Sequence, residues 1–215
     1  MILKILPVKS GWLETTNCYI IQDEETKETI VVDPGGEASK IIELLDILKA
    51  DLKYIYLTHC HGDHIEAVNG VKQAKGGKLL IHIDDAESLN NPCINMSPYM
   101  NMNLANIEVD SRVNDGDLIH IGNIEFKVIH TPGHTKGGSC LYCEKEKMLF
   151  SGDTLFKETW GRTDLPTSDF RSIINSISNK LLTLPDDTIV YPGHGEVTTI
   201  KEEEPIYYNL KERKD

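Results

Sequence analysis

Apolar residues recur along this chain with two different periods, and the alternation between them predicts strands followed by helices. Apolar runs at residues 3–8, 18–23 and 29–36 predict three successive strands, the last of which ends in a turn at Pro34-Gly35-Gly36. Residues 37–50 predict a helix, because their apolar side chains are spaced by three and four residues. Those side chains are Ile41, Leu44, Leu45 and Leu48.

The same alternation continues to the end of the chain. A buried strand is predicted at 54–59 and a second helix at 65–74. Further strands are predicted at 78–83, 117–122, 124–134, 139–153 and 188–196. Residues 168–185 show the clearest helical pattern, with Ser168 placed to cap the helix. Its predicted buried stripe consists of Phe170, Ile173, Ile174, Ile177 and Leu181. A short terminal helix, interrupted near Pro205, is expected at 198–210.

Residues 90–106 break the pattern. They are rich in Asn, Met and Pro and show no clear period. A loop of this length in a compact domain is often functional, but a plain surface excursion explains it equally well. No low-complexity linker divides the chain, so the sequence predicts a single domain over residues 1–215, of the α/β class.

Composition and charge exclude several classes of function. Apolar residues make up 40% of the chain, but no apolar run approaches the ~20 residues of a membrane span. The N-terminal residues 1–12 lack a small-residue cleavage site and read as a strand instead of a signal peptide. The formal net charge of −12 argues against a nucleic-acid partner, and bound divalent cations would offset part of it.

The five cysteines are odd in number and irregular in spacing, so a disulfide framework is not expected. Cys140 and Cys143 form a C-x-x-C pair, but this pair lies in a strand-like stretch and does not open a helix, which favours a structural role. Reduced thiols are typical of a cytoplasmic protein, and that is the predicted location.

The stretch YIYLTHCHGDH, residues 54–64, ends a buried strand with a dense group of polar side chains. His59 and His61 are two residues apart, so in an extended turn both can reach one metal ion. Asp63 and His64 lie further round and can reach a second ion. Imidazole and carboxylate ligands suit zinc, iron or manganese.

Three more candidate ligands follow apolar strands in the same way, each next to glycine: His134 in HTPGHTKGG, Asp153 in FSGDTLF and His194 in VYPGHGE. Loops at strand ends can converge on one edge of a sheet, so these residues predict a metal centre together with the first group. Asp63 and Asp153 are the candidate catalytic carboxylates, and Asp153 is the better candidate to bridge two ions.

The other histidines are predicted to lie outside the metal centre. His82, His120 and His130 each lie within or at the end of a strand, without a companion ligand in the sequence. Cys60 lies between two candidate ligands and must point away from them, so it is predicted to pack in the core.

Four motifs in order, T-H-x-H-x-D-H, T-P-G-H-T, S-G-D-T-L-F and P-G-H-G, resemble those of the metallo-β-lactamase superfamily, and most of all its short glyoxalase II-type hydrolases. The resemblance runs from about residue 11 to 200. It implies a four-layer αββα sandwich, in which two mixed sheets lie between outer helices and the metals bind at one edge.

Carried over to this chain, the resemblance implies two ligand sets. One metal would be held by His59, His61 and His134, and the other by Asp63, His64 and His194. Asp153 would bridge both metals, and Asp33 and Thr58 would orient the histidine loop. Many metallo-β-lactamases have cysteine where this chain has Asp153, which argues against antibiotic hydrolysis.

The implied activity is hydrolysis of a small-molecule thioester, such as S-lactoylglutathione, or of a related acyl ester. Two divalent ions, zinc by preference and iron or manganese as alternatives, would supply a metal-bound hydroxide at neutral pH. Arg162 and Asp164 occupy the places where full-length glyoxalase II carries a lysine and a tyrosine that touch glutathione. They are the predicted substrate-binding residues. An equally good explanation is that Arg162 pairs with a neighbouring aspartate and only braces the surface.

Two departures keep other readings open. Full-length glyoxalase II has a helical region after its P-G-H motif, whereas only residues 195–215 follow here, so a wider thioester or ester range is expected. The alternative function is that of a mononuclear-iron persulfide dioxygenase of the same superfamily, which the motifs HCH.DH and GRTD also resemble. Gly195 favours the hydrolase, because the dioxygenases tend to have Asp-Tyr after the last histidine.

Overall fold

Two six-stranded sheets form the centre of the protein in a computed structural model that describes residues 1–10 and 15–212. The first sheet has the strand order β1-β2-β3-β4-β5-β6, and the second has the order β14-β13-β10-β9-β8-β7. The first contains β1 (Ile2–Lys9), β2 (Thr15–Gln22), β3 (Glu28–Val32), β4 (Asp51–Leu57), β5 (Lys78–His82) and β6 (Ser111–Val113). The second contains β7 (Leu118–Ile121), β8 (Ile124–His130), β9 (Ser139–Cys143), β10 (Met148–Gly152), β13 (Ile189–Pro192) and β14 (Thr198–Thr199). A small hairpin joins β11 (Leu155–Phe156) to β12 (Thr159–Trp160).

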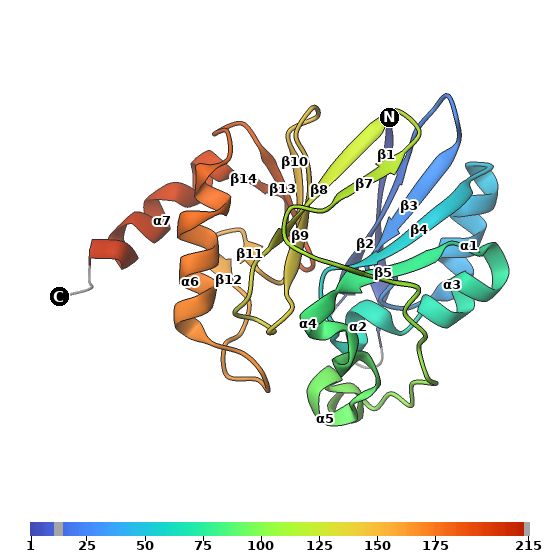
Figure 1. Cartoon of the computed structure of the whole chain (residues 1–215), viewed down its shortest axis with the longest axis horizontal. Helices are drawn as coiled ribbons and strands as arrows, with labels where there is room; N and C mark the ends of the chain where they lie inside the picture. Colours follow the sequence, from blue (N-terminus) through green and yellow to red (C-terminus); the bar gives the residue numbers. More distant parts are fainter. Residues whose placement is uncertain (11–14, 213–215) are drawn as a thin grey trace.

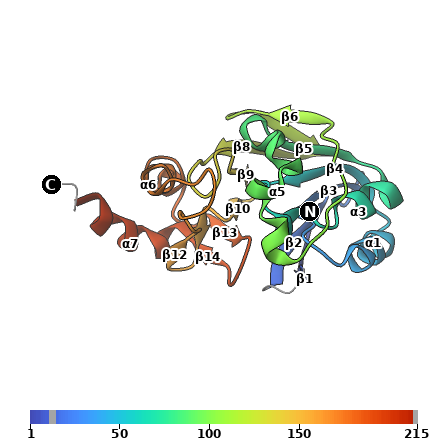
Figure 2. The ribbon, with the colours of Figure 1, turned by 90° about the horizontal axis from the view of Figure 1, so that it is seen from below.

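Helices cover the outer face of each sheet, so the predicted αββα sandwich is confirmed (Figure 1). α1 (Ala38–Ile47) and α3 (Val68–Lys75) lie on the first sheet, and α6 (Phe170–Asn179) and α7 (Ile200–Glu212) lie on the second. Figure 2, turned by 90°, shows these helix layers at opposite sides of the molecule with the strands between them.

Three apolar clusters hold the layers together. Ile41, Leu45 and Val71 pack under the first helix layer, whereas Ile173 and Ile177 pack under the second. The cluster between the sheets contains the aromatic side chains Tyr19, Tyr56, Phe126 and Phe150. Cys140 and Cys143, three residues apart in β9, belong to different clusters, since successive side chains of a strand point to opposite faces. The C-x-x-C pair is therefore a packing feature, with both thiols free.

Three predicted helices differ from the structure. The terminal helix was expected to be interrupted near Pro205, but α7 continues through this residue. The helix expected at 65–74 is divided into α2 (Gly62–Ile65) and α3, so α2 begins inside the histidine motif. In the helix expected at 168–185, the cap is Asp169, whose carboxylate accepts the N–H of Ser172 at 2.7 Å. Ser168 instead closes a turn with Leu165, and Phe170 is 48% exposed because it precedes the buried face of α6.

The segment 90–106 begins with short helical turns, and from residue 102 onward it has no regular secondary structure. The turns are η1 (Ser88–Asn90), α5 (Pro92–Asn95) and η2 (Ser97–Met100), which follow the short helix α4 (Ile83–Ala86). Another short helical turn, η3 (Leu181–Thr183), follows α6. Figure 1 shows α2, α4 and α5 together at one end of the first sheet, where the loop after β4 also lies. Among the described residues, no helix combines the length and the apolar character that crossing a membrane requires.

Candidate metal centre

The seven predicted ligands lie in loops at the ends of four strands, and the fold brings them together. The loop after β4 and helix α2 carry four of them, and the loops after β8, β10 and β13 carry His134, Asp153 and His194. We call His59, His61 and His134 the first set, and Asp63, His64 and His194 the second set. Within each set, one potential ligand atom from each residue lies within 4.8 Å of the others.

Asp153 lies between the two sets. Its Oδ2 atom is 3.4 Å from His134 Nε2 of the first set and 3.6 Å from His194 Nε2 of the second. Its Oδ1 atom is 3.3 Å from His64 Nε2. Gly193 permits this approach, because a Cβ atom at that position would lie 2.3 Å from Asp153 Oδ1. One carboxylate thus faces ligands from both sets.

The hydrogen bonds around the cluster fix which nitrogen of each histidine faces it. His134 Nδ1 donates to the carbonyl of Arg162 at 2.9 Å, and His194 Nδ1 donates to the carbonyl of Thr15 at 3.1 Å. His64 Nδ1 donates to Asp33 at 2.9 Å. Because each of these three Nδ1 atoms carries a proton, Nε2 is the nitrogen that faces the cluster and offers a lone pair when the ring is neutral.

His59 is oriented through a relay of two residues. Thr58 Oγ1 donates to Asp33 at 2.7 Å and therefore accepts from His59 Nδ1 at 3.0 Å. Asp33 also accepts the backbone N–H of Thr58 at 2.8 Å. Its backbone is in the left-handed region, with φ 50°, which is strained for a non-glycine residue. Asp33 and Thr58 thus contact the ligands His64 and His59, as the resemblance implied.

The arrangement fits a divalent cation. Three buried polar atoms of the cluster have no hydrogen-bond partner among the described residues, namely His59 Nε2, His61 Nε2 and Asp153 Oδ1. His61 Nδ1 and His134 Nε2 approach to 2.9 Å, so the fold brings a ring nitrogen of each loop to the same point. The donors are imidazole nitrogen and carboxylate oxygen, the ligands preferred by several divalent metals.

Cys60 is fully buried in the core beneath the first helix layer, as predicted.

The pKa values of two first-set histidines, His59 and His61, are shifted in the opposite direction from that of His194 in the second set. In the first set, burial holds the pKa of His59 well below its usual value and lowers that of His61 to about 3. In the second set, burial also opposes protonation, but the negative charge of Asp153 and the hydrogen bond with Asp63 raise the pKa of His194 to about 9. Burial likewise opposes ionisation of Asp153, yet His194 and His64 keep the pKa of this carboxyl well below its ordinary range. Without metal, His194 therefore holds a proton that His59 and His61 do not.

A cleft of about 430 Å³ opens onto the cluster. One side is formed by predicted ligands, including Asp63 and Asp153. The apolar part of its lining, called here the apolar wall, consists of Met100, Phe156, Trp160 and Leu165. Met100 belongs to the segment 90–106, so this segment lines the candidate site.

Arg162 borders the same cleft, and its side chain pairs with Asp164 through two hydrogen bonds of 2.9 Å. These two side chains are 68% and 69% exposed. The predicted pairing as a surface brace is therefore present, and the role of both residues in substrate binding stays a prediction. The backbone contribution of Arg162 to His134 was not predicted.

Two of the remaining histidines have a companion, contrary to the sequence analysis. His82 and His130 stack with ring centroids 3.9 Å apart and planes inclined by 11°, and Asp84 lies beside them. Imidazole lone pairs lie in the ring plane, so two nearly parallel rings do not converge on one ion. The nitrogens are also used locally, because His82 Nδ1 accepts the N–H of Asp84 and His130 Nε2 donates to the carbonyl of Lys136.

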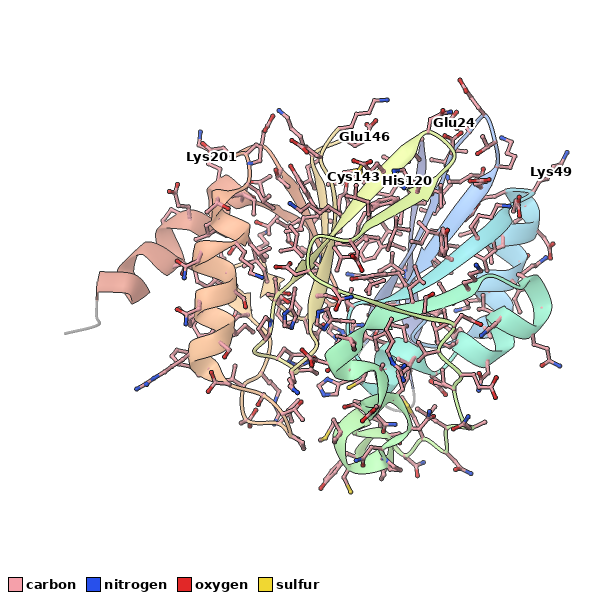
Figure 3. All side chains as sticks on the ribbon, viewed as in Figure 1. Glu24, Lys49, His120, Cys143, Glu146 and Lys201 are labelled. Carbon is pink, nitrogen blue, oxygen red and sulfur yellow. The ribbon has the colours of Figure 1, made fainter. Side chains whose placement is uncertain are left out.

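His120 pairs with Glu125 on the surface. Figure 3 shows His120 at the upper edge of the molecule, away from the lower edge where α2 and α4 lie.

Sequence reasoning also missed residues that hold the ligand loops. Asn17 donates from its side chain to the carbonyls of Pro192 and Gly195 on both sides of His194. Asp85, in α4, accepts hydrogen bonds from the loops of both His59 and His134. Neither residue belongs to a motif, and the only sequence signal for Asp85 is an acidic pair just after an apolar strand.

Comparison with known proteins identifies relatives that match nearly the whole chain. The family model of the metallo-beta-lactamase superfamily matches residues 11–194. The hydroxyacylglutathione hydrolase GloC of Haemophilus influenzae is 34% identical over 209 residues, which cover 94% of this chain and 95% of the relative.

Solved structures agree with this similarity. The BLEG-1 B3 metallo-beta-lactamase superposes with a TM-score of 0.87 at 36% identity, covering 95% of this chain and 97% of its own. TTHA1623 in a di-iron-bound form gives 0.80 at 31% identity, with 93% and 96% covered. ETHE1 from Myxococcus xanthus gives 0.79 at 25% identity, with 99% and 91% covered.

Proposed function

Because this chain belongs to the metallo-β-lactamase superfamily, we propose that it is a binuclear metal-dependent hydrolase that cleaves a thioester, such as S-lactoylglutathione, or a related acyl ester. The observation that carries the proposal is the position of Asp153, which faces ligands of both sets beside a substrate-sized cleft. The similarity to GloC supports a thioester as the substrate class.

Each ligand set would hold one ion, and Asp153 would be shared between them. When bound, two divalent ions, zinc by preference, supply Lewis acidity and lower the pKa of water so that a nucleophile is available at neutral pH. Asp63 and Asp153 are the proposed catalytic carboxylates, since both border the cleft. Asp63 Oδ2 lies 3.2 Å from His194 Nε2, so it fixes that ring against the shared carboxylate.

The rest of the cleft would bind and orient the substrate. The apolar wall of Met100, Phe156, Trp160 and Leu165 would receive its uncharged part and exclude water from the reacting carbonyl. Arg162 lines the cleft and pairs with Asp164, and both side chains are exposed, so a charged group of the substrate could meet Arg162 at the solvent. We propose that Arg162 contacts such a carboxylate, in competition with Asp164.

The alternative is a mononuclear-iron persulfide dioxygenase, and the similarity to ETHE1 keeps it as a second candidate. A single-iron enzyme needs only part of the ligand cluster. In this chain the second set is complete, and His64 Nε2 and His194 Nε2 approach to 3.3 Å. That proximity favours a second ion and therefore the hydrolase.

The test uses protein loaded with zinc alone and kept under anaerobic conditions. Zinc has no redox chemistry, so cleavage of S-lactoylglutathione under these conditions supports the hydrolase. Parallel assays offer a β-lactam, because of the similarity to BLEG-1, and glutathione persulfide with the iron-loaded protein. Oxygen uptake by the iron form without thioester cleavage by the zinc form would favour the dioxygenase over the hydrolase. Cleavage of the β-lactam alone would contradict the proposal that the substrate is a thioester.

A further inference from the structure

Asp85 is a buried carboxylate that neither ligand set uses. It lies in α4, directly after β5, and is 1% exposed. Its Oδ2 atom accepts the backbone N–H of Cys60 at 3.1 Å and the hydroxyl of Thr135 at 2.7 Å. Its Oδ1 atom accepts the backbone N–H of Gly137 at 2.7 Å. A carboxylate in this position is thus surrounded by donors from two different loops.

Those donors lie directly beside ligands of the first set. Cys60 is the residue between His59 and His61, and Thr135 follows His134. The loop of His59 and His61 leaves the first sheet, whereas the loop of His134 leaves the second. The first set is therefore assembled across the two sheets, and Asp85 contacts both of the loops that carry it.

Asp85 lies close against the loop of His134. A Cβ atom at Gly137 would lie 2.4 Å from the backbone nitrogen of Asp85, so only glycine allows this approach. The three hydrogen-bond partners are all donors, and an ionised carboxylate is an acceptor at both oxygens. An asparagine of the same shape would turn an N–H group toward one of these donors.

We propose that Asp85 is a positioning residue for the first metal, which joins the loop of His59 and His61 to the loop of His134 and sets the separation of the three imidazoles. The inference rests on the proposed binding of metal by the first set and does not depend on the substrate. Groups that orient metal ligands typically contribute 10- to 100-fold to metal affinity.

The experiment measures stepwise zinc affinities of the whole protein by competition with a chromogenic chelator, together with the visible spectrum of the cobalt form. Asp85→Asn is expected to weaken one of the two binding steps 10- to 100-fold. The cobalt bands that change should be those that His134→Ala removes. Asp84→Asn is the matched control, because it removes a carboxylate from the same helix that makes only a salt bridge to Lys136 and a weak contact to His82. It should change neither affinity more than about twofold, the usual size of a surface effect.

The melting temperature of the metal-free protein separates positioning from general stability. A purely structural role would lower that temperature and leave the affinity of the folded protein unchanged, which would contradict the inference. If Asp85→Asn does not fold, Thr135→Val removes one of the three donors at constant shape, and it should still weaken the same step several-fold. An unchanged zinc affinity of the Thr135→Val protein would also contradict the inference. Absence of metal binding in the unmodified protein would overturn the metal proposal itself, which is a different result.

Discussion

The two ligand sets of the metal centre are built from similar residues but differ in charge. The first set consists of three buried histidines, two of which have their pKa lowered by burial. The second set joins a carboxylate to two histidines whose pKa is raised by Asp63 and Asp153, although burial opposes the shift. His59 and His61 thus stay neutral whereas His64 and His194 hold protons, because Asp153 and Asp63 outweigh the effect of burial only at the second pair.

This difference indicates how each half would take up an ion. The first set offers lone pairs without losing protons, whereas the second must release protons before its nitrogens can bind. Asp153 belongs to both halves, so it is the residue whose loss should matter most.

Asp153→Ala should abolish the difference between the halves by removing the shared anion. We expect metal content to fall from close to two ions per chain to one or fewer, and turnover of S-lactoylglutathione to fall at least about a thousandfold, as for loss of a main electrostatic element. Metal analysis and steady-state kinetics on protein of unchanged circular dichroism check this. A folded variant with full metal and full activity would overturn the binuclear centre.

The second prediction concerns proton release on metal binding. With the pKa of His194 raised to about 9, this side chain carries a proton at pH 7 in the metal-free protein. Binding at the second set should therefore strengthen about tenfold per pH unit for each proton displaced, from pH 6 up to about 9. Binding at the first set should depend little on pH in this range, because the pKa of His61 is already about 3.

Calorimetry of zinc binding in buffers of different ionisation enthalpy measures the number of protons released in each step. We expect almost none in one step and one to two in the other. The variant His194→Ala should remove most of the release. Equal proton release in both steps would show that the two halves do not differ in charge as described.

Much of this centre could be predicted from sequence because metal ligands are strongly constrained. All seven candidate ligands lie in short motifs after apolar strands, so residue type and spacing were sufficient to predict a cluster that the structure brings together. Asn17 and Asp85 were missed because they act through contacts with residues far away in the sequence. Asn17, for example, binds the carbonyl of Pro192, and no local period signals such a pair.

The fold shows the same limit. The outer helices were predicted because their apolar side chains follow the helical period, but the cap of α6 was assigned to Ser168 instead of Asp169. Both residue types cap helices well, and the choice was decided by the turn that Ser168 closes with Leu165. The segment 90–106 has no periodicity because its turns are too short to show any.

The stacked pair of buried His82 and half-buried His130 provides a comparison with the histidines of the candidate metal centre, since it lacks converging lone pairs. Burial and then His130 lower the pKa of His82 to about 4. The folded protein therefore keeps His82 neutral down to about pH 4, whereas the unfolded chain takes up a proton near pH 6.5. The contribution of His82 to stability should be constant above pH 6.5 and should be lost as the pH decreases from 6.5 to 4.

His82→Asn tests this, because asparagine can still accept the N–H of Asp84 at the start of α4 but does not titrate. Chemical unfolding with a chelator present, at pH 7.5 and pH 5, should show that the unmodified protein loses about 1–2 kcal/mol more than the variant. Equal losses would mean that His82 titrates normally in the folded state.

The smallest expected effect concerns Arg162, whose backbone serves the first set while its side chain faces solvent. Arg162→Ala keeps the carbonyl that accepts from His134, so metal content should not change. The KM for S-lactoylglutathione should rise several-fold with little change in kcat, because a remote anchor contributes equally to ground state and transition state.

Asp164→Asn should act in the opposite direction and lower KM about two- to threefold, since the exposed ion pair that competes with the substrate is worth less than about 1 kcal/mol. A neutral thioester is the control substrate and should be insensitive to both changes. If Arg162→Ala lowers kcat and kcat/KM equally, the guanidinium acts in the chemical step instead, and if Asp164→Asn has no effect on the anionic substrate, the pair is a surface brace.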